Sequence, residues 1–231
     1  MSTCPGRRAI YHAVVTDDLL SGLSEDERRL IIAKMSRRSF KKGETLFHEG
    51  DPGDSLHLLL KGRVAVRVST PNGDVATLSV QGPGSSFGEQ ALVSAESRRT
   101  ASVVALEPVE TRMLHRNDFD DLRRRHPSAE RFIVDALAEQ VRRLSAQVLD
   151  ALYVAADKRV VRRVADLVLL YDDGSSPFEI PVKQEDLASM AGTTRPTANR
   201  VLKHLEDDGL IALGRGRIDV LDADGIRRRA R

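Results

Sequence analysis

Two segments, FGEQAL at residues 87–92 and RTASV at residues 99–103, carry the chemistry of the first domain of this sequence. Gly88 opens a short predicted helical turn, whose free backbone N–H groups can donate hydrogen bonds to an anion. Arg99 can neutralise a phosphate group, and the hydroxyl of Thr100 can donate a hydrogen bond to it. These groups together predict an anion-binding cradle.

Glu89 lies beside this cradle, where a bound phosphate would repel its carboxylate. The carboxylate is therefore expected to accept hydrogen bonds from a ribose hydroxyl. A sugar phosphate as ligand accounts for both the positive Arg99 and the negative Glu89, because its phosphate would bind the arginine and its hydroxyl would bind the carboxylate. The alternative is that Glu89 and Arg99 pair with each other on the surface, which is the more common arrangement for two isolated charges.

Short apolar stretches separated by glycine and proline surround the cradle, from about residue 40 to residue 114. Asn72 and Gly73 both tolerate positive φ, so a hairpin is predicted between the stretches that flank them. The pattern predicts an antiparallel β domain. Its expected strands are Leu56 to Leu60, Val64 to Val68, Val75 to Val80 and Ala101 to Leu106.

Helices are predicted on both sides of the β domain. Ser24 and Glu27 form a capping box, which predicts a helix that stops near Phe40. After Asn117, apolar residues at helical spacing predict one long helix with a coiled-coil stripe. This helix either lies over its own β domain or pairs with a copy of itself, and the regular stripe favours a homodimer. The stripe consists of Ile133, Leu137, Val141, Leu144, Val148, Ala151 and Ala155.

The chain from about Asp157 has the outline of a winged helix-turn-helix. We expect a helix over Arg159 to Tyr171, a turn-rich stretch over Asp172 to Pro177 and a strand at Phe178 to Pro181. Two short helices follow, and a Gly-Arg-Gly hairpin leads to a final strand at Ile218 to Leu221.

The helix-turn-helix itself is predicted from several coincident constraints. Ala188 is small where the two helices cross, and Gly192 supplies the positive φ of the tight turn. Thr194 caps the second helix, and Pro196 occupies its first turn, where a missing N–H costs nothing. The apolar residues expected to close the core are Leu187, Ala198, Val201 and Leu202.

The outward polar residues of the second helix are predominantly basic, which predicts DNA binding. Arginine can donate to guanine and asparagine can pair with adenine, so we expect base contacts from Arg195, Arg200 and Asn199, with Lys203 on the same face. Phosphate contacts are expected from Lys183, Gln184, Thr194 and Thr197, and backbone contacts from Arg215 and Arg217 in the wing.

The composition is that of an ordinary soluble globular protein, with 231 residues of which 30% are charged and 41% are apolar. Collagen-like, disordered and disulfide-rich classes are thereby excluded. No apolar run is long enough to cross a bilayer, so we expect a cytoplasmic protein without membrane contact. The net charge of +2 is too small to indicate nucleic-acid binding by itself.

Metal and catalytic sites are not expected. Cys4 is the one cysteine, whereas an iron–sulfur cluster needs several thiolates. The six histidines occur in unrelated contexts, and each is interpreted as a surface or boundary residue. No Ser-His-Asp set, metal cluster or Walker loop is visible, so no enzymatic role is predicted.

The order Phe-Gly-Glu, Ala-Leu and Arg-Thr-Ala, preceded by turns at Gly53 and Gly62, resembles the phosphate-binding cassette of cyclic-nucleotide-binding domains. Over nearly the whole chain, the sequence resembles the cyclic-AMP receptor protein/fumarate-nitrate regulator (Crp/Fnr) family of bacterial transcription regulators. The resemblance implies an α+β protein with an N-terminal antiparallel β-roll (a cyclic-nucleotide-binding jelly roll), a long central dimerisation helix and a C-terminal winged helix-turn-helix. The implied domains are 1–126, 127–156 and 157–231.

The resemblance also implies a ligand site. Gly88 would donate a backbone N–H, Glu89 would hold the ribose hydroxyl, and Arg99 and Thr100 would hold the cyclic phosphate. The Thr-Ser pair that reads adenine in the family corresponds here to Leu144 and Ser145, and leucine offers no hydrogen bond, so base discrimination is expected to be weaker. The full expected set is Gly88, Glu89, Gln90, Ala91, Arg99, Thr100, Leu144 and Ser145.

These implications predict a sequence-specific DNA-binding transcription regulator controlled by a cyclic nucleotide. Cyclic AMP is the leading ligand, and another cyclic nucleotide or no physiological ligand are the alternatives. Pro196 stands where the family has a base-reading glutamate, so specificity at that base should differ. A homodimer on an inverted-repeat DNA site is expected, with RNA polymerase as a partner if the protein is an activator. Rival interpretations are a ligand-independent regulator with a vestigial pocket and an enzyme acting on nucleotides.

Overall fold

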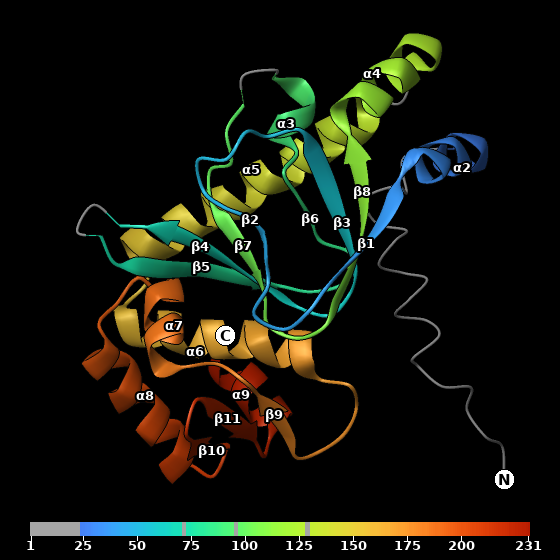
Figure 1. Ribbon diagram of the computed structural model, residues 1–231. Helices are drawn as coiled ribbons and strands as arrows, with labels where there is room; N and C mark the ends of the chain where they lie inside the picture. The colour runs from blue at the N-terminus through green and yellow to red at the C-terminus, as the bar shows by residue number, and fades with distance from the viewer. Residues whose placement is uncertain (1–23, 71–72, 95–96, 128–129) are drawn as a thin grey trace, which may run out of the picture. The chain divides into compact units, whose positions relative to one another are not determined.

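The computed structural model describes residues 24–70, 73–94, 97–127 and 130–231 (Figure 1). The chain divides into two units: one holds the residues up to Ser69 together with Val80–Arg143, and the other holds Thr70–Ser79 together with Leu144–Arg231. Cys4 lies outside the described residues, and so does Asn72 of the predicted hairpin. Gly73 of that hairpin is described, with a φ of +86°.

Two antiparallel four-stranded sheets form the β-roll, as predicted (Figure 1). Their strand orders are β1-β8-β3-β6 and β2-β7-β4-β5. All four predicted strands are present, as β3, β4, β5 and β7, and four further strands complete the sheets. The strands are β1 Ser36–Phe40, β2 Thr45–Phe47, β3 Ser55–Lys61, β4 Val64–Ser69, β5 Val75–Gln81, β6 Ser86–Phe87, β7 Ser102–Ala105 and β8 Val109–His115.

The first described helix is shorter than we predicted. Helix α2, Glu25–Lys34, begins at the predicted capping box, in which the Ser24 side chain accepts from the backbone of Glu27. The prediction that it stops near Phe40 is wrong, because residues 36–40 form the edge strand β1 and pair with β8. That pairing is with residues far along the chain, which local periodicity cannot reveal.

Strand β3 separates two apolar cores, because alternate residues of a strand point to opposite faces. Leu56 and Leu58 pack into a cluster with residues of α2, α4 (Arg116–Arg125) and α5 (Glu130–Tyr153). Leu59 packs on the other side, with apolar residues of β4, β6, β7 and β8. The face of β3 that carries Leu59 therefore points into the interior of the β-roll.

The long central helix differs from the prediction in two respects. Helices α4 and α5 are separate, and Ala155, which we placed in the stripe, instead precedes α6 as its N-cap residue. The two halves of the apolar stripe also differ in solvent exposure. Ile133 is 3% exposed in the core of the β-roll unit, whereas Val141 is 61% and Val148 is 55% exposed. One half of the stripe thus covers its own domain and the other half is uncovered.

The C-terminal part is a winged helix-turn-helix, as predicted. Its sheet has the order β10-β11-β9, and Gly192 has a φ of +57° at the turn between α7 and α8. The Thr194 side chain accepts from the backbone of Thr197 at the start of α8, and the predicted core residues are buried. The elements are α6 Ala156–Tyr171, β9 Phe178–Ile180, α7 Gln184–Met190, α8 Arg195–Asp207, β10 Ile211–Gly214, β11 Arg217–Val220 and α9 Ala223–Arg229.

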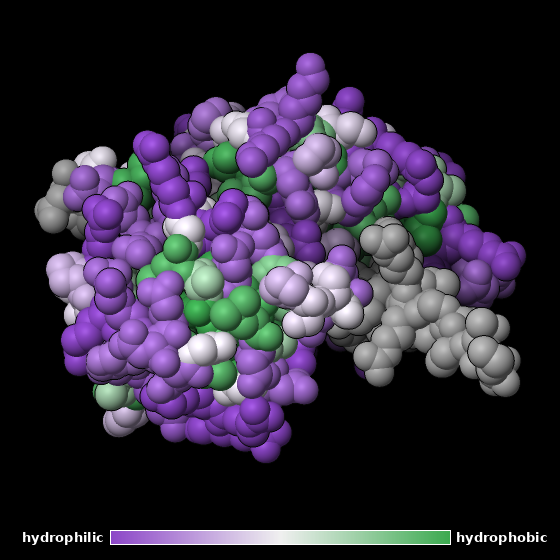
Figure 2. All heavy atoms as spheres, turned by 90° about the horizontal axis from the view of Figure 1, so that it is seen from below, coloured by the Kyte–Doolittle hydropathy of each residue, from purple (hydrophilic) through white to green (hydrophobic). Residues whose placement is uncertain are grey.

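The surface reflects the high content of charged residues. Figure 2 shows one face of the molecule, on which hydrophilic side chains surround a smaller group of apolar ones. Within the described part of the chain, no helix has the length and hydropathy needed to span a membrane. The same residues contain no group of three or more His, Cys, Asp or Glu side chains arranged to hold a metal ion.

The turn at Gly62 is expected to be intolerant of a side chain. Gly62 has a φ of +82°, and a Cβ there would collide with the carbonyl oxygen of Pro108 and lie 2.9 Å from Cγ2 of Val109. Gly43 has a similar φ of +83°, but a Cβ there would meet nothing within 4 Å. We expect Gly43→Ala to cost about 1 kcal/mol through backbone strain alone, and Gly62→Ala to cost at least about 3 kcal/mol.

Urea unfolding followed by circular dichroism measures both free energies. Equal destabilisation in the two variants would contradict the close packing inferred at Gly62.

Candidate functional site

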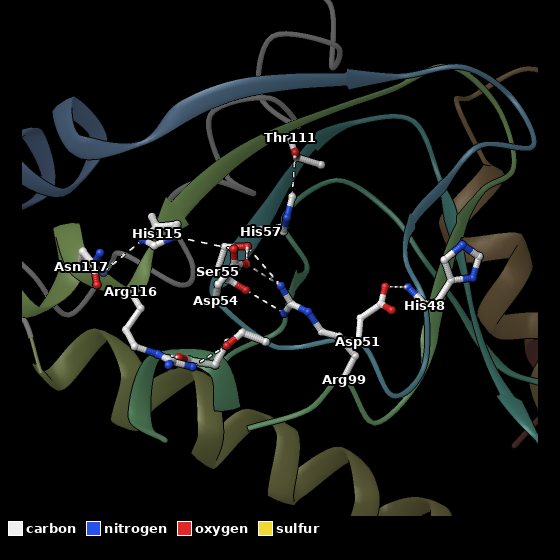
Figure 3. Close-up of polar contacts among 12 residues, drawn as sticks. His48, Asp51, Asp54, Ser55, His57, Arg99, Thr111, His115, Arg116 and Asn117 are labelled. Carbon is white, nitrogen blue, oxygen red and sulfur yellow. Dashed lines mark hydrogen bonds and ion pairs between the residues drawn. The ribbon is translucent and has the colours of Figure 1, made fainter. Parts of the chain in front are cut away.

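Arg99 is buried inside the β-roll, with 7% of its surface exposed (Figure 3). One guanidinium nitrogen, Nη1, donates to the carbonyl oxygen of Ser55 at 2.7 Å, and Nη2 donates to the Ser55 hydroxyl at 3.1 Å. Nη2 also lies 3.5 Å from a carboxylate oxygen of Asp54. The guanidinium carbon is 4.1 Å from the ring centroid of Phe47, which is a cation–π contact.

The buried Nε–H of Arg99 has no hydrogen-bond partner among the described residues. Burial lowers the pKa of Arg99, and the carboxylates of Asp54, Asp51 and Glu89 oppose this shift. The contacts with Ser55 and Asp54 would therefore hold the guanidinium in position before an anion binds beside it.

Because Gly88 has no side chain, the guanidinium of Arg99 can pack directly against its backbone. Its φ is +85°, and a Cβ at this position would collide with Nη1 of Arg99 and lie 2.7 Å from the carbonyl oxygen of Ser55. Only glycine satisfies both the backbone conformation and the close approach. The structure thus brings Gly88 and Arg99 together.

Glu89 is also buried, at 4% exposure, and begins the short helix α3, Gln90–Val93, as its N-cap residue. The hydroxyl of Ser86 donates to its Oε1 at 2.6 Å. Among the described residues it forms no ion pair with Arg99, whose carboxylate partner is Asp54. The surface pair considered above is therefore not the observed arrangement. Because a carboxylate offers about four acceptor positions, Glu89 retains capacity for a ligand hydroxyl.

The other expected ligand residues differ in exposure. Ala91 is buried, whereas Gln90 and Thr100 are exposed. Leu144 and Ser145 lie on α5 in the second unit and are both exposed.

His57 is a buried polar residue that we did not predict. It is 5% exposed, on the inward face of β3, so its interpretation as a surface or boundary histidine is wrong. Its Nδ1 lies 3.1 Å from Oγ1 of Thr111, and its ring stacks on Phe87 with centroids 5.6 Å apart. Phe40 and Phe47 pack around it. The alternation of β3 places His57 on the same side as Leu59, and that was the available signal.

The pKa of His57 falls from its ordinary value of 6.5 to about 4. Burial is the main cause, and repulsion by Arg99 and Arg38 adds to it, while Asp54 acts in the opposite direction. His57 is therefore neutral at pH 7 and adds no charge to the site.

The second candidate site is the outer face of α8. Arg195, Arg200 and Lys203 are exposed there, and Asn199 is partly exposed. Their spacing places them on one side of the helix. Of the residues expected to contact phosphates, Lys183 is exposed as the N-cap residue of α7, Gln184 and Thr197 are partly exposed, and Thr194 is exposed. The wing residues Arg215 and Arg217 are also exposed.

Acidic residues accompany three of these arginines, which we did not predict. The pairs are Arg195 with Glu185 at 3.0 Å, Arg200 with Asp157 at 2.8 Å, and Arg217 with Asp219 at 3.3 Å and Glu179 at 3.6 Å. The candidate DNA face therefore carries both signs of charge.

Two family models match separate parts of the chain. Residues 37–126 match the family model of the cyclic nucleotide-binding domain. Residues 159–229 match the model of the Crp-like helix-turn-helix domain.

Known relatives span nearly the whole chain. The cyclic AMP receptor protein of Thermus thermophilus is 34% identical over 206 residues, which cover 89% of this chain and 93% of the relative. The crystal structure of the catabolite activator protein of the same organism matches 92% of this chain and 98% of its own, with 33% identity and a TM-score of 0.53. The c-di-GMP responsive regulator CLP of Xanthomonas campestris has a TM-score of 0.69 and covers 86% of this chain and 99% of its own, but at 21% identity it shows the fold alone.

The buried His57 predicts a specific pH dependence of stability. Between pH 6.5 and about 4 the unfolded chain binds a proton at this residue that the folded chain does not, so acidification lowers the free energy of unfolding. His57→Gln should reduce the stability lost between pH 7 and pH 4.5 by about 2 kcal/mol.

Urea unfolding at the two pH values measures this difference. His204→Gln, at an exposed position of α8, is the matched control. An unchanged pH dependence in His57→Gln would show that His57 is not held neutral by its surroundings.

Proposed function

This chain belongs to the Crp family of transcription regulators, which bind DNA, and we propose that a cyclic nucleotide, cyclic AMP, controls its binding to DNA. The observation that carries the proposal is the buried guanidinium of Arg99, whose Nη1 lies against the Gly88 turn and whose Nε–H has no partner among the described residues. A buried cation with an unused donor is suited to an anionic ligand, because a charge-assisted hydrogen bond is strong away from water.

The proposed ligand contacts follow from the chemistry of the residues. Arg99 would neutralise the cyclic phosphate, and the backbone of Gly88 would donate to it. Glu89 would accept from the ribose hydroxyl, since among the described residues Ser86 occupies only one of its oxygens. Thr100 and Gln90 are exposed and would contact the ligand at its edge.

Cyclic AMP is proposed because of the relative that is named for it. The cyclic AMP receptor protein of Thermus thermophilus is 34% identical to this chain. The fold by itself does not specify the effector, since the Xanthomonas campestris regulator of the same fold is described as responsive to c-di-GMP. Leu144 supplies no hydrogen bond to a base, so we propose that Ser145 and packing read the adenine less stringently.

The uncovered half of the α5 stripe is the proposed homodimer interface. Its members Val141, Leu144 and Val148 are between 51% and 61% exposed at helical spacing, and Leu152, next to the stripe residue Ala151, is 69% exposed. A two-fold dimer would present two α8 helices to successive major grooves, so the DNA site would be an inverted repeat with half-site centres about 34 Å apart. We propose a cytoplasmic regulator that contacts RNA polymerase where it activates transcription.

Removal of the Arg99 guanidinium should abolish most ligand affinity. We expect Arg99→Ala to weaken cyclic AMP binding by at least about 2 kcal/mol, roughly 30-fold, because the phosphate loses its buried partner. Arg98→Ala is the matched control, since Arg98 is exposed and donates only to the carbonyl oxygen of Gly50 among the described residues. Calorimetry measures both affinities, and DNA binding with and without cyclic AMP measures the control of function.

The wild type provides the decisive comparison. Wild-type DNA binding that is independent of every cyclic nucleotide tested would instead identify a ligand-independent regulator with a vestigial pocket. Equal affinities in Arg99→Ala and wild type would refute the site.

Charges on the uncovered stripe should separate the dimer. The double variant Leu144→Asp, Val148→Asp places like charges against each other at the proposed axis, so we expect monomers in sedimentation experiments. Leu169→Asp is the control, because Leu169 on α6 is 57% exposed, as Leu144 is 51% exposed, but lies off the stripe. A double variant that sediments as a dimer would place the interface elsewhere.

A further inference from the structure

Asp157 and Arg200 form an ion pair between two helices that are distant in sequence. A carboxylate oxygen of Asp157 accepts from Nη2 of Arg200 at 2.8 Å, across 43 residues of chain. Asp157 lies in the first turn of α6, where the positive end of the helix dipole stabilises a carboxylate. Arg200 lies on the outer face of α8, within the helix-turn-helix. The acid that holds this arginine therefore comes from outside the motif.

The pair contributes little to folding. The side chains of Arg200 and Asp157 are 57% and 49% exposed, and ion pairs at such exposure are screened by water. DNA is a polyanion, so a carboxylate on a DNA-binding face would repel its phosphates.

The geometry leaves part of the guanidinium available. Arginine has five N–H donors, and the structure gives one of them to Asp157. The remaining donors suffice for a bidentate contact with the O6 and N7 atoms of guanine. A guanidinium that is already held loses less side-chain freedom when it makes this contact.

We propose that Asp157 is a specificity-determining residue for DNA binding, which orients Arg200 toward a base and withholds it from phosphates. The inference rests on the proposed function, in that it assumes sequence-specific binding of DNA through α8. In a complex with unrelated DNA, Arg200 would stay paired and add little to phosphate neutralisation. In the specific complex, Arg200 would keep Asp157 and donate its free edge to guanine. Asp157 thus lowers non-specific affinity and preserves specific affinity.

The Arg195–Glu185 ion pair differs from the Arg200–Asp157 pair in the location of its acidic residue. Both side chains are 64% exposed, and Glu185 lies on α7 of the motif itself. Glu185 is therefore carried toward DNA on the same motif as its arginine, whereas Asp157 is fixed by α6. Asp157 therefore differs from Glu185 in that it holds its arginine from a helix outside the motif.

The test uses the full chain with cyclic AMP present and the duplex selected from a random DNA library by the wild type. Dissociation constants are measured for this duplex, for duplexes altered at single base pairs of each half-site, and for an unrelated duplex. For Asp157→Asn we expect affinity for the unrelated duplex to rise about 3-fold to 10-fold, since Arg200 becomes free to neutralise phosphate. Discrimination at one base pair of each half-site should fall at least about 5-fold.

Three control variants separate positioning from charge. Asp207→Asn removes the same charge from the far end of α8, where the exposed Asp207 has no ion pair within the described residues, and it should leave base discrimination unchanged. Asp157→Glu keeps the charge and should restore most of the discrimination. In an Arg200→Ala background, Asp157→Asn should cause no further loss of discrimination, because the two residues act as one unit.

The outcomes distinguish this inference from the proposed function. If the wild type selects a sequence and Asp157→Asn discriminates as well as the wild type, the positioning role is overturned while DNA binding stands. An equal loss of discrimination in Asp207→Asn also overturns it, since charge alone would then explain the effect. If the wild type selects no sequence, the proposed function fails and the inference fails with it.

Discussion

The structure of the β-roll interior depends on the burial of one cation, Arg99. A guanidinium away from water must have hydrogen-bond acceptors, and Ser55 supplies two of them, a carbonyl and a hydroxyl oxygen. The backbone must also approach the guanidinium closely, and only Gly88 allows this. Phe47 covers the remaining face of the cation. The glycine turn, the start of β3 and the aromatic side chains are thus arranged around a single charge, whose Nε–H has no partner among the described residues.

The same interior explains why His57 remains neutral. A second cation beside Arg99 would be strongly unfavourable in this apolar environment, and the pKa of His57 falls to about 4 because of burial and of Arg99. His57 instead acts as an uncharged ring that stacks on Phe87 and contacts Thr111. The site therefore presents one cation and one buried carboxylate, which matches a sugar phosphate in sign and in number of polar groups.

Helix α5 shows how one amphipathic stripe can meet two different environments. Its first turns bury Phe132 and Ile133 against the core of the β-roll unit, and its later apolar residues remain uncovered. Periodicity is the same in both halves, since it reports only that one face is apolar. Coverage depends on what lies opposite that face. The helix begins in one unit and ends in the other.

The sequence alone determined the features that local geometry encodes. Positive φ at Gly73 and Gly192, the capping residues Ser24 and Thr194, and the period of two in the main strands are properties of a few neighbouring residues, so the residue order predicts them. Tertiary structure alone decided the contacts between residues far apart in the chain. Arg99 meets Ser55 across 44 residues, His57 meets Thr111 across 54, and Arg200 meets Asp157 across 43. The edge strand β1 likewise exists only because β8 pairs with it. No local propensity specifies such partners, because each of these side chains has many equivalent partners in sequence and only the folded backbone brings one of them within hydrogen-bonding distance.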